Sequence, residues 1–284
     1  MTREQKARKP HRKRSRLFVT IIVTAALALL FVLPLVTLLA YSLLKPDALA
    51  DALASGDFLA FLGKSYSFDQ YYELLIENYP FMAHFWRSLL YAGATTGITI
   101  VVSVPTAFLF AKVQWKGRDA IFFFYIVLMM LPYQVLMVPL YKQFSDGGLL
   151  NNPLAIILPA AFQPFWVFML RQFAKSIPDS LMDAMKLETN SVLNFFRYLI
   201  IPLLGDCILA LAVLSFADNW NLYEPALIML ETKELFPLPI ILSKLLESDM
   251  GIAFSASVVY ILPAAVLFIG AKEKLAKGVE VMKW

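Results

Sequence analysis

Long apolar runs alternate with shorter polar segments along most of the chain. Six of these runs approach the roughly 20 apolar residues that an α-helix needs to cross the hydrocarbon core of a bilayer. They cover residues 18–41, 88–110, 120–140, 153–170, 198–216 and 252–271. The pattern predicts an all-α integral membrane protein with six transmembrane helices.

The composition agrees with a membrane protein. Of the 284 residues, 60% are hydrophobic and 16% are charged, whereas soluble domains carry about 25% charged residues. The third to fifth runs also contain prolines, which kink helices unless neighbouring groups satisfy the freed carbonyls, so we expect these helices to pack around a cavity. The prolines are Pro132, Pro139, Pro159, Pro164 and Pro202.

The placement of lysine and arginine predicts the orientation. With a cytoplasmic N-terminus, the inner segments hold 19 of the 25 basic residues and the outer segments hold 6, as the positive-inside rule requires. The inner segments are 1–16, 112–118, 171–197 and 272–284, and the outer segments are 42–87, 141–152 and 218–251. Both termini are therefore expected in the cytoplasm. Segment 1–16 also has the composition of a nucleic-acid arm, but the apolar run that follows at once favours an orienting flank and no nucleic-acid partner.

Residues that would carry chemistry are scarce. Cys207 is the only cysteine, and His11 and His84 are the only histidines. A disulfide within the chain is therefore excluded, and we predict no metal site and no catalytic residue. Asp206 is the most unusual residue in the apolar runs, and it could pair across a subunit interface or face an inner vestibule. An intramembrane enzyme would need paired carboxylates or histidines, and a channel would need a filter-like or charged-ring pattern.

The polar segment between the fourth and fifth runs is longer than a connection between two spans requires. Pro178 suits a first helical turn, and Ser176 or Ser180 can cap it. Leu181 and Met185 then indicate a short, half-apolar helix with charges on its other side. The segment is expected to do something outside the membrane.

From about residue 71 to the C-terminus, the chain resembles the permease subunits of ABC importers, in the carbohydrate class related to the smaller maltose permease. Landmarks agree in order, among them Leu131-Pro132-Tyr133-Gln134, Gly148-Leu149-Leu150-Asn151-Asn152 and Trp220-Asn221-Leu222-Tyr223-Glu224-Pro225. Asp183-Ala184-Met185 aligns with the Glu-Ala-Ala start of the family's cytoplasmic motif. Thr189 and Asn190 stand where that motif prefers small residues that permit a turn.

The resemblance implies that residues 174–197 hold a cytoplasmic coupling helix between spans four and five. Such a helix inserts into a groove on an ATP-hydrolysing subunit. The residues implied are Leu181, Asp183, Ala184, Met185, Leu187, Glu188, Thr189 and Asn190. The expected organisation is a basic cytoplasmic tail at 1–16, a six-span permease domain at 17–284 with outer loops at 42–87, 141–152 and 218–251, and a cytoplasmic tail at 272–284.

The resemblance also implies partners. They are a second, homologous permease subunit, two ATP-binding subunits that carry ATP and Mg²⁺, an extracytoplasmic solute-binding protein and membrane lipid. The chain itself is then no enzyme and binds no cofactor, and it lies in a bacterial inner membrane.

Polar and aromatic residues deep in the apolar runs are candidates for a sugar pathway, because amides match hydroxyl groups and aromatic rings stack on sugars. The candidates are Gln134, Gln163, Asn219, Trp220, Ser257 and Tyr260. Each could instead satisfy the backbone of a neighbouring helix. Glycerol phosphate, an oligopeptide or an amino acid are alternative cargoes, although a phosphate would favour arginine or lysine in the spans.

Overall fold

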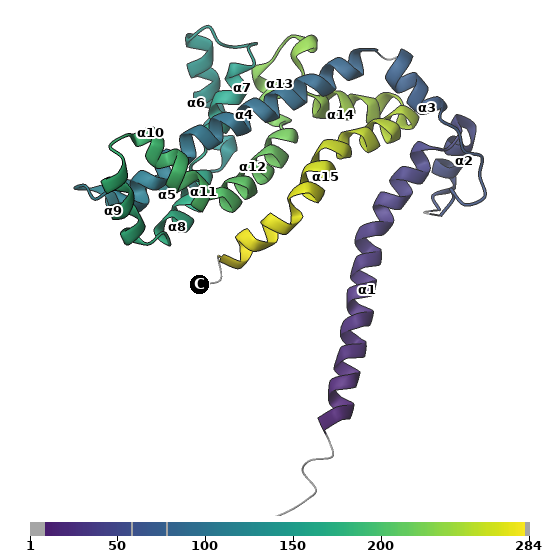
Figure 1. Cartoon of the computed structure of the whole chain (residues 1–284). Coiled ribbons are helices and arrows are strands. Elements are labelled where there is room, and N and C mark those ends of the chain that lie inside the picture. Colours follow the sequence, from purple (N-terminus) through teal and green to yellow (C-terminus); the bar gives the residue numbers. More distant parts are fainter. Residues whose placement is uncertain (1–8, 58, 78, 282–284) are drawn as a thin grey trace, which may run out of the picture. The chain divides into compact units, whose positions relative to one another are not determined.

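The computed structural model describes residues 9–57, 59–77 and 79–281, and its regular elements are helices (Figure 1). The outermost parts of the two predicted tails, 1–8 and 282–284, lie outside the described residues. The chain divides into two compact units. One comprises residues 1–78 and 245–259, and the other comprises residues 79–244 and 260–284.

The first unit contains α1 (Lys9–Ser42), whose portion Phe18–Ser42 is long and apolar enough to cross a membrane. The helix begins at Lys9, inside the segment 1–16 predicted as a cytoplasmic tail. None of the membrane-length window is buried within the chain. An exposed surface of this kind requires lipid or another apolar partner.

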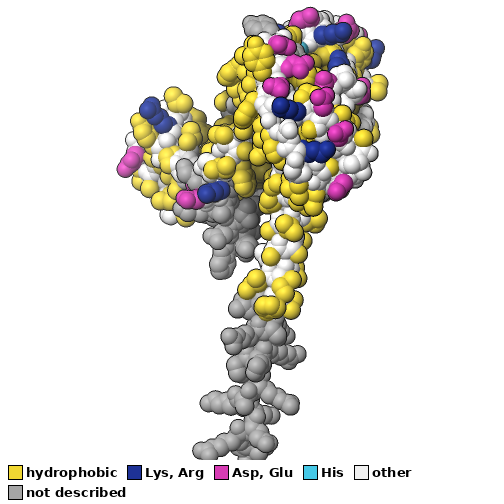
Figure 2. Space-filling view, turned by 90° about the vertical axis from the view of Figure 1, so that its right-hand side faces the viewer, with side chains coloured by type: hydrophobic (Ala, Val, Ile, Leu, Met, Phe, Trp, Pro, Cys, Tyr) yellow, Lys and Arg dark blue, Asp and Glu magenta, His cyan; other side chains and the backbone are white. Residues whose placement is uncertain are grey.

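The predicted outer loop 42–87 is largely helical. It contains α2 (Pro46–Ser55), α3 (Asp69–Tyr72) and the π-helix η2 (Glu73–Glu77). Gly56 ends α2 in the left-handed conformation, at φ 64°. Gln70 ties the unit together, because its Nε2 donates to the Leu44 carbonyl at 2.7 Å and its Oε1 accepts from Ser255 Oγ at 3.2 Å. Acidic and basic side chains gather over this helical segment, whereas the visible part of α1 is apolar (Figure 2).

The second unit is built around α4 (Tyr79–Lys112), which packs most extensively against α12 (Gly205–Trp220) and α8 (Pro164–Lys175). α4 begins at Tyr79, so it extends well into the segment predicted as an outer loop. The remaining helices of this unit surround these three (Figure 1). Among them are α5 (Arg118–Met129), α6 (Tyr133–Asp146), α7 (Leu154–Ala161), α9 (Asp179–Glu188), α10 (Val192–Phe195), the π-helix η3 (Phe196–Ile200), α11 (Ile201–Leu203) and α13 (Glu224–Met229).

Four helices in the described residues are long and apolar enough to span a membrane, and up to six spans result if each of two bent pairs counts as one. α5 and α6 meet at 98° around Pro132, within the single span predicted over 120–140. The Val192–Leu203 stretch meets α12 at 79°. Proline removes a backbone donor and restricts the preceding residue, which accounts for the break at Pro132.

The predicted outer loop 218–251 is also largely helical. Besides α13 it contains the 3₁₀ helix η4 (Lys233–Leu235), α14 (Leu238–Ser248) and the start of α15 (Met250–Val281). The segment before α14 is held by α4, because His84 Nδ1 lies 2.7 Å from the Phe236 carbonyl and Ser88 Oγ accepts from Leu238 N at 2.6 Å. His84 and Ser88 are one helical turn apart, so one face of α4 serves both bonds.

Candidate functional site

The start of α9 is fixed to the end of α4. Lys112, the last residue of α4, donates from Nζ to the Ile177 carbonyl and to Asp179 Oδ1, the latter at 2.8 Å. The Lys112 side chain is only 10% exposed, whereas that of Asp179 is 82% exposed. The hydrogen bond from Lys112 lowers the pKa of the Asp179 carboxyl group below its ordinary value. These contacts hold the start of α9 against the end of α4.

The cap of α9 differs from the sequence prediction. Pro178 is the residue before the first turn, and no side chain caps the helix. Ser176 Oγ instead donates to the Phe173 carbonyl at 2.7 Å, which completes the end of α8. Serine often bonds to the backbone of the preceding turn, and that local partner prevails here.

The outward face of α9 carries three of the residues predicted to contact an ATPase. At about 100° per residue, Asp183, Ala184 and Leu187 share one side of the helix, and Met182 lies on the opposite side. Met182 is buried in the core, whereas Leu187 is 90% exposed. Asp183 also pairs with Lys186 at 2.9 Å. α9 therefore presents an apolar side chain beside a carboxylate to the surroundings.

The other predicted contact residues flank this face. Leu181 is 42% exposed, Met185 is half-buried and Glu188 is exposed. Thr189 takes an extended conformation, at φ −148° and ψ 138°. The connection to α10 thus avoids the left-handed region that a β-branched residue resists. Thr189 Oγ1 accepts from Ser191 N at 3.1 Å, which stabilises this extended turn.

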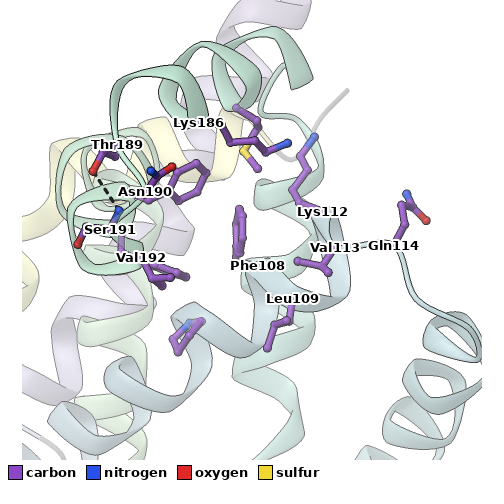
Figure 3. Close-up of a pocket in the computed structure, with 14 residues that line it drawn as sticks. Phe108, Leu109, Lys112, Val113, Gln114, Lys186, Thr189, Asn190, Ser191 and Val192 are labelled. Atoms are coloured by element: carbon purple, nitrogen blue, oxygen red, sulfur yellow. Dashed lines mark hydrogen bonds between the residues drawn. The ribbon is translucent and has the colours of Figure 1, made fainter.

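A cavity of about 830 Å³ separates the end of α4 from the α9–α10 segment (Figure 3). Phe108, Leu109 and Lys112 approach from α4, and Lys186 and the stretch from Thr189 to Val192 lie across from them. Phe108 stacks edge-on against Phe195 and Phe196, with ring centroids 5.6 and 5.3 Å apart. This aromatic contact is the second connection between α4 and the segment.

Arg171 connects other helices near the same end of the unit. Its side chain is 7% exposed, and Nε donates to the Phe110 carbonyl at 3.0 Å. Nη2 reaches Asp119 Oδ1 at 3.4 Å, and the guanidinium carbon lies 3.7 Å from the centroid of the Phe122 ring. Arg171 therefore joins α8 to α4 and α5. The sequence alone assigned this residue no role.

A second cavity, of about 580 Å³, is lined by polar groups. Gln163 lies at its edge, in the extended break between α7 and α8, where Pro164 starts the second helix. Asp218, Asn221 and Glu224 contribute polar groups from α12 and the following segment. The other lining residues are Tyr133, Ile156, Ala160, Leu222, Tyr223 and Pro225. A broken apolar helix beside a polar cavity is typical of transporter binding sites.

The structure brings only part of the predicted pathway to this cavity. Gln163 lines it, and Gln134 lies beside it because its Nε2 donates to Glu224 Oε2 at 3.4 Å. Asn219, in contrast, is buried and donates to the Ser215 carbonyl at 2.7 Å. Asn219 satisfies its own helix, and its neighbour Asp218 reaches the cavity because one step along a helix turns the side chain by about 100°.

Trp220 and Tyr260 stack on each other next to the cavity. Trp220 is 2% exposed, stacks on Tyr260 at 5.4 Å between ring centroids, and donates to the Tyr260 carbonyl at 3.1 Å. The Tyr260 hydroxyl donates to Asn221 Oδ1 at 2.5 Å. Both residues therefore position a lining residue without lining the cavity themselves. Ser257 belongs to the first unit, where its hydroxyl donates to the Ala253 carbonyl.

Asp206 has a local explanation. The bend before α12 places it in the first turn of that helix, where a carboxylate interacts favourably with the helix dipole. The sequence alone could not show that a helix begins at Gly205, inside an apolar run.

Asn151 holds the segment that follows α13. It takes the left-handed conformation, at φ 56°. Its Oδ1 accepts from Glu231 N and Thr232 N at 3.0 and 2.9 Å, and its Nδ2 donates to Thr232 Oγ1. Asparagine tolerates this backbone better than most residues, and its amide satisfies three groups at once.

Comparison with known proteins gives consistent likenesses. The family model for the inner membrane component of binding-protein-dependent transport systems matches residues 100–280. The chain is 32% identical over 258 residues to the arabinooligosaccharide transport permease AraQ of Bacillus subtilis (strain 168), which covers 90% of this chain and 91% of AraQ. It is 28% identical over 197 residues to the lactose transport permease LacG of Rhizobium radiobacter, which covers 68% of this chain and 72% of LacG.

A solved structure shares the fold. It is a crystal structure of a bacterial ABC transporter involved in the import of the acidic polysaccharide alginate. The match has a TM-score of 0.80 at 20% identity and covers 92% of this chain and 96% of that chain.

Proposed function

Since the chain belongs to the family of inner membrane components of binding-protein-dependent transport systems, we propose that it forms half of the translocation pathway of an ATP-driven importer. It is a permease subunit in an ABC importer, and its relatives are transport permeases. In the proposed arrangement each bent helix pair is one span, which makes six. The permease domain is then residues 17–284, and both termini are cytoplasmic.

The observation that carries the proposal is the construction of α9. Its outward face presents Leu187 at 90% exposure beside Asp183 and Ala184, and its base is tied to α4 through Lys112. An exposed apolar side chain on an otherwise polar segment fits a groove on another protein. We assign α9 as the coupling helix, with Leu181, Met185, Glu188, Thr189 and Asn190 around the contact.

In this account, closure of two ATP-binding subunits pushes α9. The push reaches α4 through the Lys112 contacts and α10 through the aromatic contacts of Phe108. A shift of these helices reorients the membrane spans and changes the side from which the substrate path is open. ATP and Mg²⁺ are held by the ATP-binding subunits, so this chain needs neither. A second, homologous permease completes the pathway.

The proposed cargo is a sugar or oligosaccharide delivered by an extracytoplasmic binding protein. The names of AraQ and LacG support this class. The cavity at Gln163 offers amides, tyrosines and carboxylates that suit hydroxyl groups. Glycerol phosphate or another non-sugar solute is the alternative within the same architecture. An intramembrane enzyme or a channel is the alternative outside it.

ATP-driven uptake tests the proposal. The complete complex, co-expressed with its neighbouring subunits and purified, is reconstituted in vesicles with its binding protein and a panel of labelled saccharides and glycerol phosphate. We expect uptake of at least one saccharide that requires ATP hydrolysis and the binding protein. Isolation of a homo-oligomer without ATP-binding subunits, or downhill flux that needs no ATP, would contradict it.

A further inference from the structure

The charged groups that line the cavity at the α7–α8 break all have the same sign. Among the described residues that line it, Asp218 and Glu224 are charged and none is a lysine or an arginine. Glu224 accepts from Gln134, whereas the Asp218 and Gln163 side chains make no hydrogen bond to another described residue. The Tyr133 hydroxyl also makes none. Three polar side chains of different chemistry therefore line this space without a hydrogen-bond partner among the described residues.

We propose that this cavity selects saccharides that carry no acidic group, with Asp218 and Glu224 accepting hydrogen bonds from sugar hydroxyls and repelling carboxylate or phosphate substituents. This inference rests on the proposed function and deepens it by naming the substrate class. Ionised carboxylates accept hydrogen bonds only, so they match hydroxyl donors and cannot donate to an anion. Gln163 provides both a donor and an acceptor, and the Tyr133 ring provides an apolar face.

The geometry keeps the two carboxylates in place. Glu224 is in the first turn of α13, and Gln134 approaches it from α6. Asp218 lies in the last turns of α12, between the buried residues Phe216 and Trp220, which fix the direction of that helix. Both carboxylates are therefore carried by helices rather than by a free loop.

The first test measures the sign of the potential directly and needs no substrate. In a Cys207→Ser background, the lining residue Leu222 is replaced by cysteine in the assembled complex. The thiol is labelled with a cationic trimethylammonium-ethyl or an anionic sulfonatoethyl methanethiosulfonate. Gln114→Cys is the matched control, because it lines the other cavity, whose charged lining residues are Lys112 and Lys186.

At Leu222→Cys we expect the ratio of the cationic to the anionic labelling rate to exceed the same ratio for free 2-mercaptoethanol by about tenfold. In the Leu222→Cys protein, this preference for the cationic reagent should fall when Asp218→Asn or Glu224→Gln is added. At Gln114→Cys the preference should be absent or reversed. Equal normalised rates for both reagents at Leu222→Cys would overturn the inference.

The second test uses uptake of a neutral oligosaccharide and of its C6-oxidised uronic acid by the reconstituted complex. We expect the neutral sugar to be preferred by about tenfold, and the Asp218→Asn and Glu224→Gln double variant to narrow this preference. Equal uptake of both sugars, or an unchanged preference in the double variant, would overturn the inference. Lack of uptake of any saccharide would contradict the proposed function itself, and the labelling ratio would still report the charge of the cavity.

Discussion

Lys112 Nζ lies 2.8 Å from Asp179 Oδ1, which joins the last residue of α4 to the first residue of α9. The two residues are separated by 67 positions in the sequence. Lys112 also holds the Ile177 carbonyl, so one ammonium group serves both the main chain and a side chain. This contact fixes the first residue of α9 to the last residue of α4.

Removing this contact should loosen α9 without unfolding the unit. Asp179→Asn removes the ion pair, and Lys112→Met removes the bond to Ile177 as well. We expect ATP-driven uptake to fall in both variants, and more in Lys112→Met, whereas ATP hydrolysis should be less affected. Uptake per ATP hydrolysed in vesicles measures this. Equal uptake per ATP hydrolysed in both variants and the natural protein would exclude the proposed role of Lys112 in coupling ATP hydrolysis to uptake.

The same ion pair should depend on pH. The pKa of Asp179 is lowered in the folded protein, so its stabilising contribution is present above the ordinary aspartate pKa of about 3.9 and is lost as the pH falls below the folded value. The difference in melting temperature between the natural protein and Asp179→Asn should therefore be constant near pH 7. It should shrink below about pH 4. A difference that grows on acidification would contradict this assignment.

Arg171 is expected to require its planar guanidinium group. Arg171→Lys cannot bond the Phe110 carbonyl and stack on Phe122 in the same geometry, so we expect a loss of about 1–3 kcal/mol in stability. Thermal unfolding in detergent measures it. Asp119→Asn is the matched control, because the Asp119 side chain is 72% exposed and water replaces the lost partner. An Asp119→Asn variant that is less stable than Arg171→Lys would contradict this role of the guanidinium group.

Asn151 allows backbone and side-chain effects to be separated. Asn151→Gly keeps the left-handed conformation and loses three hydrogen bonds, whereas Asn151→Ala also incurs a backbone cost of about 1 kcal/mol. We expect both variants to speed trypsin cleavage after Lys233, with alanine the faster. Mass spectrometry of the fragments measures the rates. Cleavage at the natural rate in Asn151→Ala would show that the segment is held by other contacts.

Sequence alone could predict the class of fold and the position of α9, because both depend on local patterns. Apolar runs of span length and the polar segment around Asp183 are visible without a structure. The proline alone predicts a bend at Pro132, but the angle of 98° between α5 and α6 depends on how these helices pack. The helical content of 42–87 was missed because α2, α3 and η2 are short and their stability comes from contacts such as that of Gln70 with Ser255.

The polar cavity could be predicted only in part. Gln163 stands out in an apolar run, and a proline follows it. Asn219 and Asp218 are adjacent, however, and only the helix phase decides which one is buried. Glu224 was visible as an outer acidic residue, but its approach to Gln134 depends on the α5–α6 bend.

Leu187 gives the most direct test of the coupling assignment, because it is 90% exposed and its replacement leaves the core unchanged. The measurement is ATP hydrolysis by the reconstituted complex with and without substrate-loaded binding protein, for Leu187→Asp and the conservative variant Leu187→Met. Our account predicts that Leu187→Asp reduces the stimulation by more than about tenfold, as for an interface hot spot, and that Leu187→Met retains it. Full stimulation in Leu187→Asp would contradict the proposal that α9 couples this chain to its ATPase.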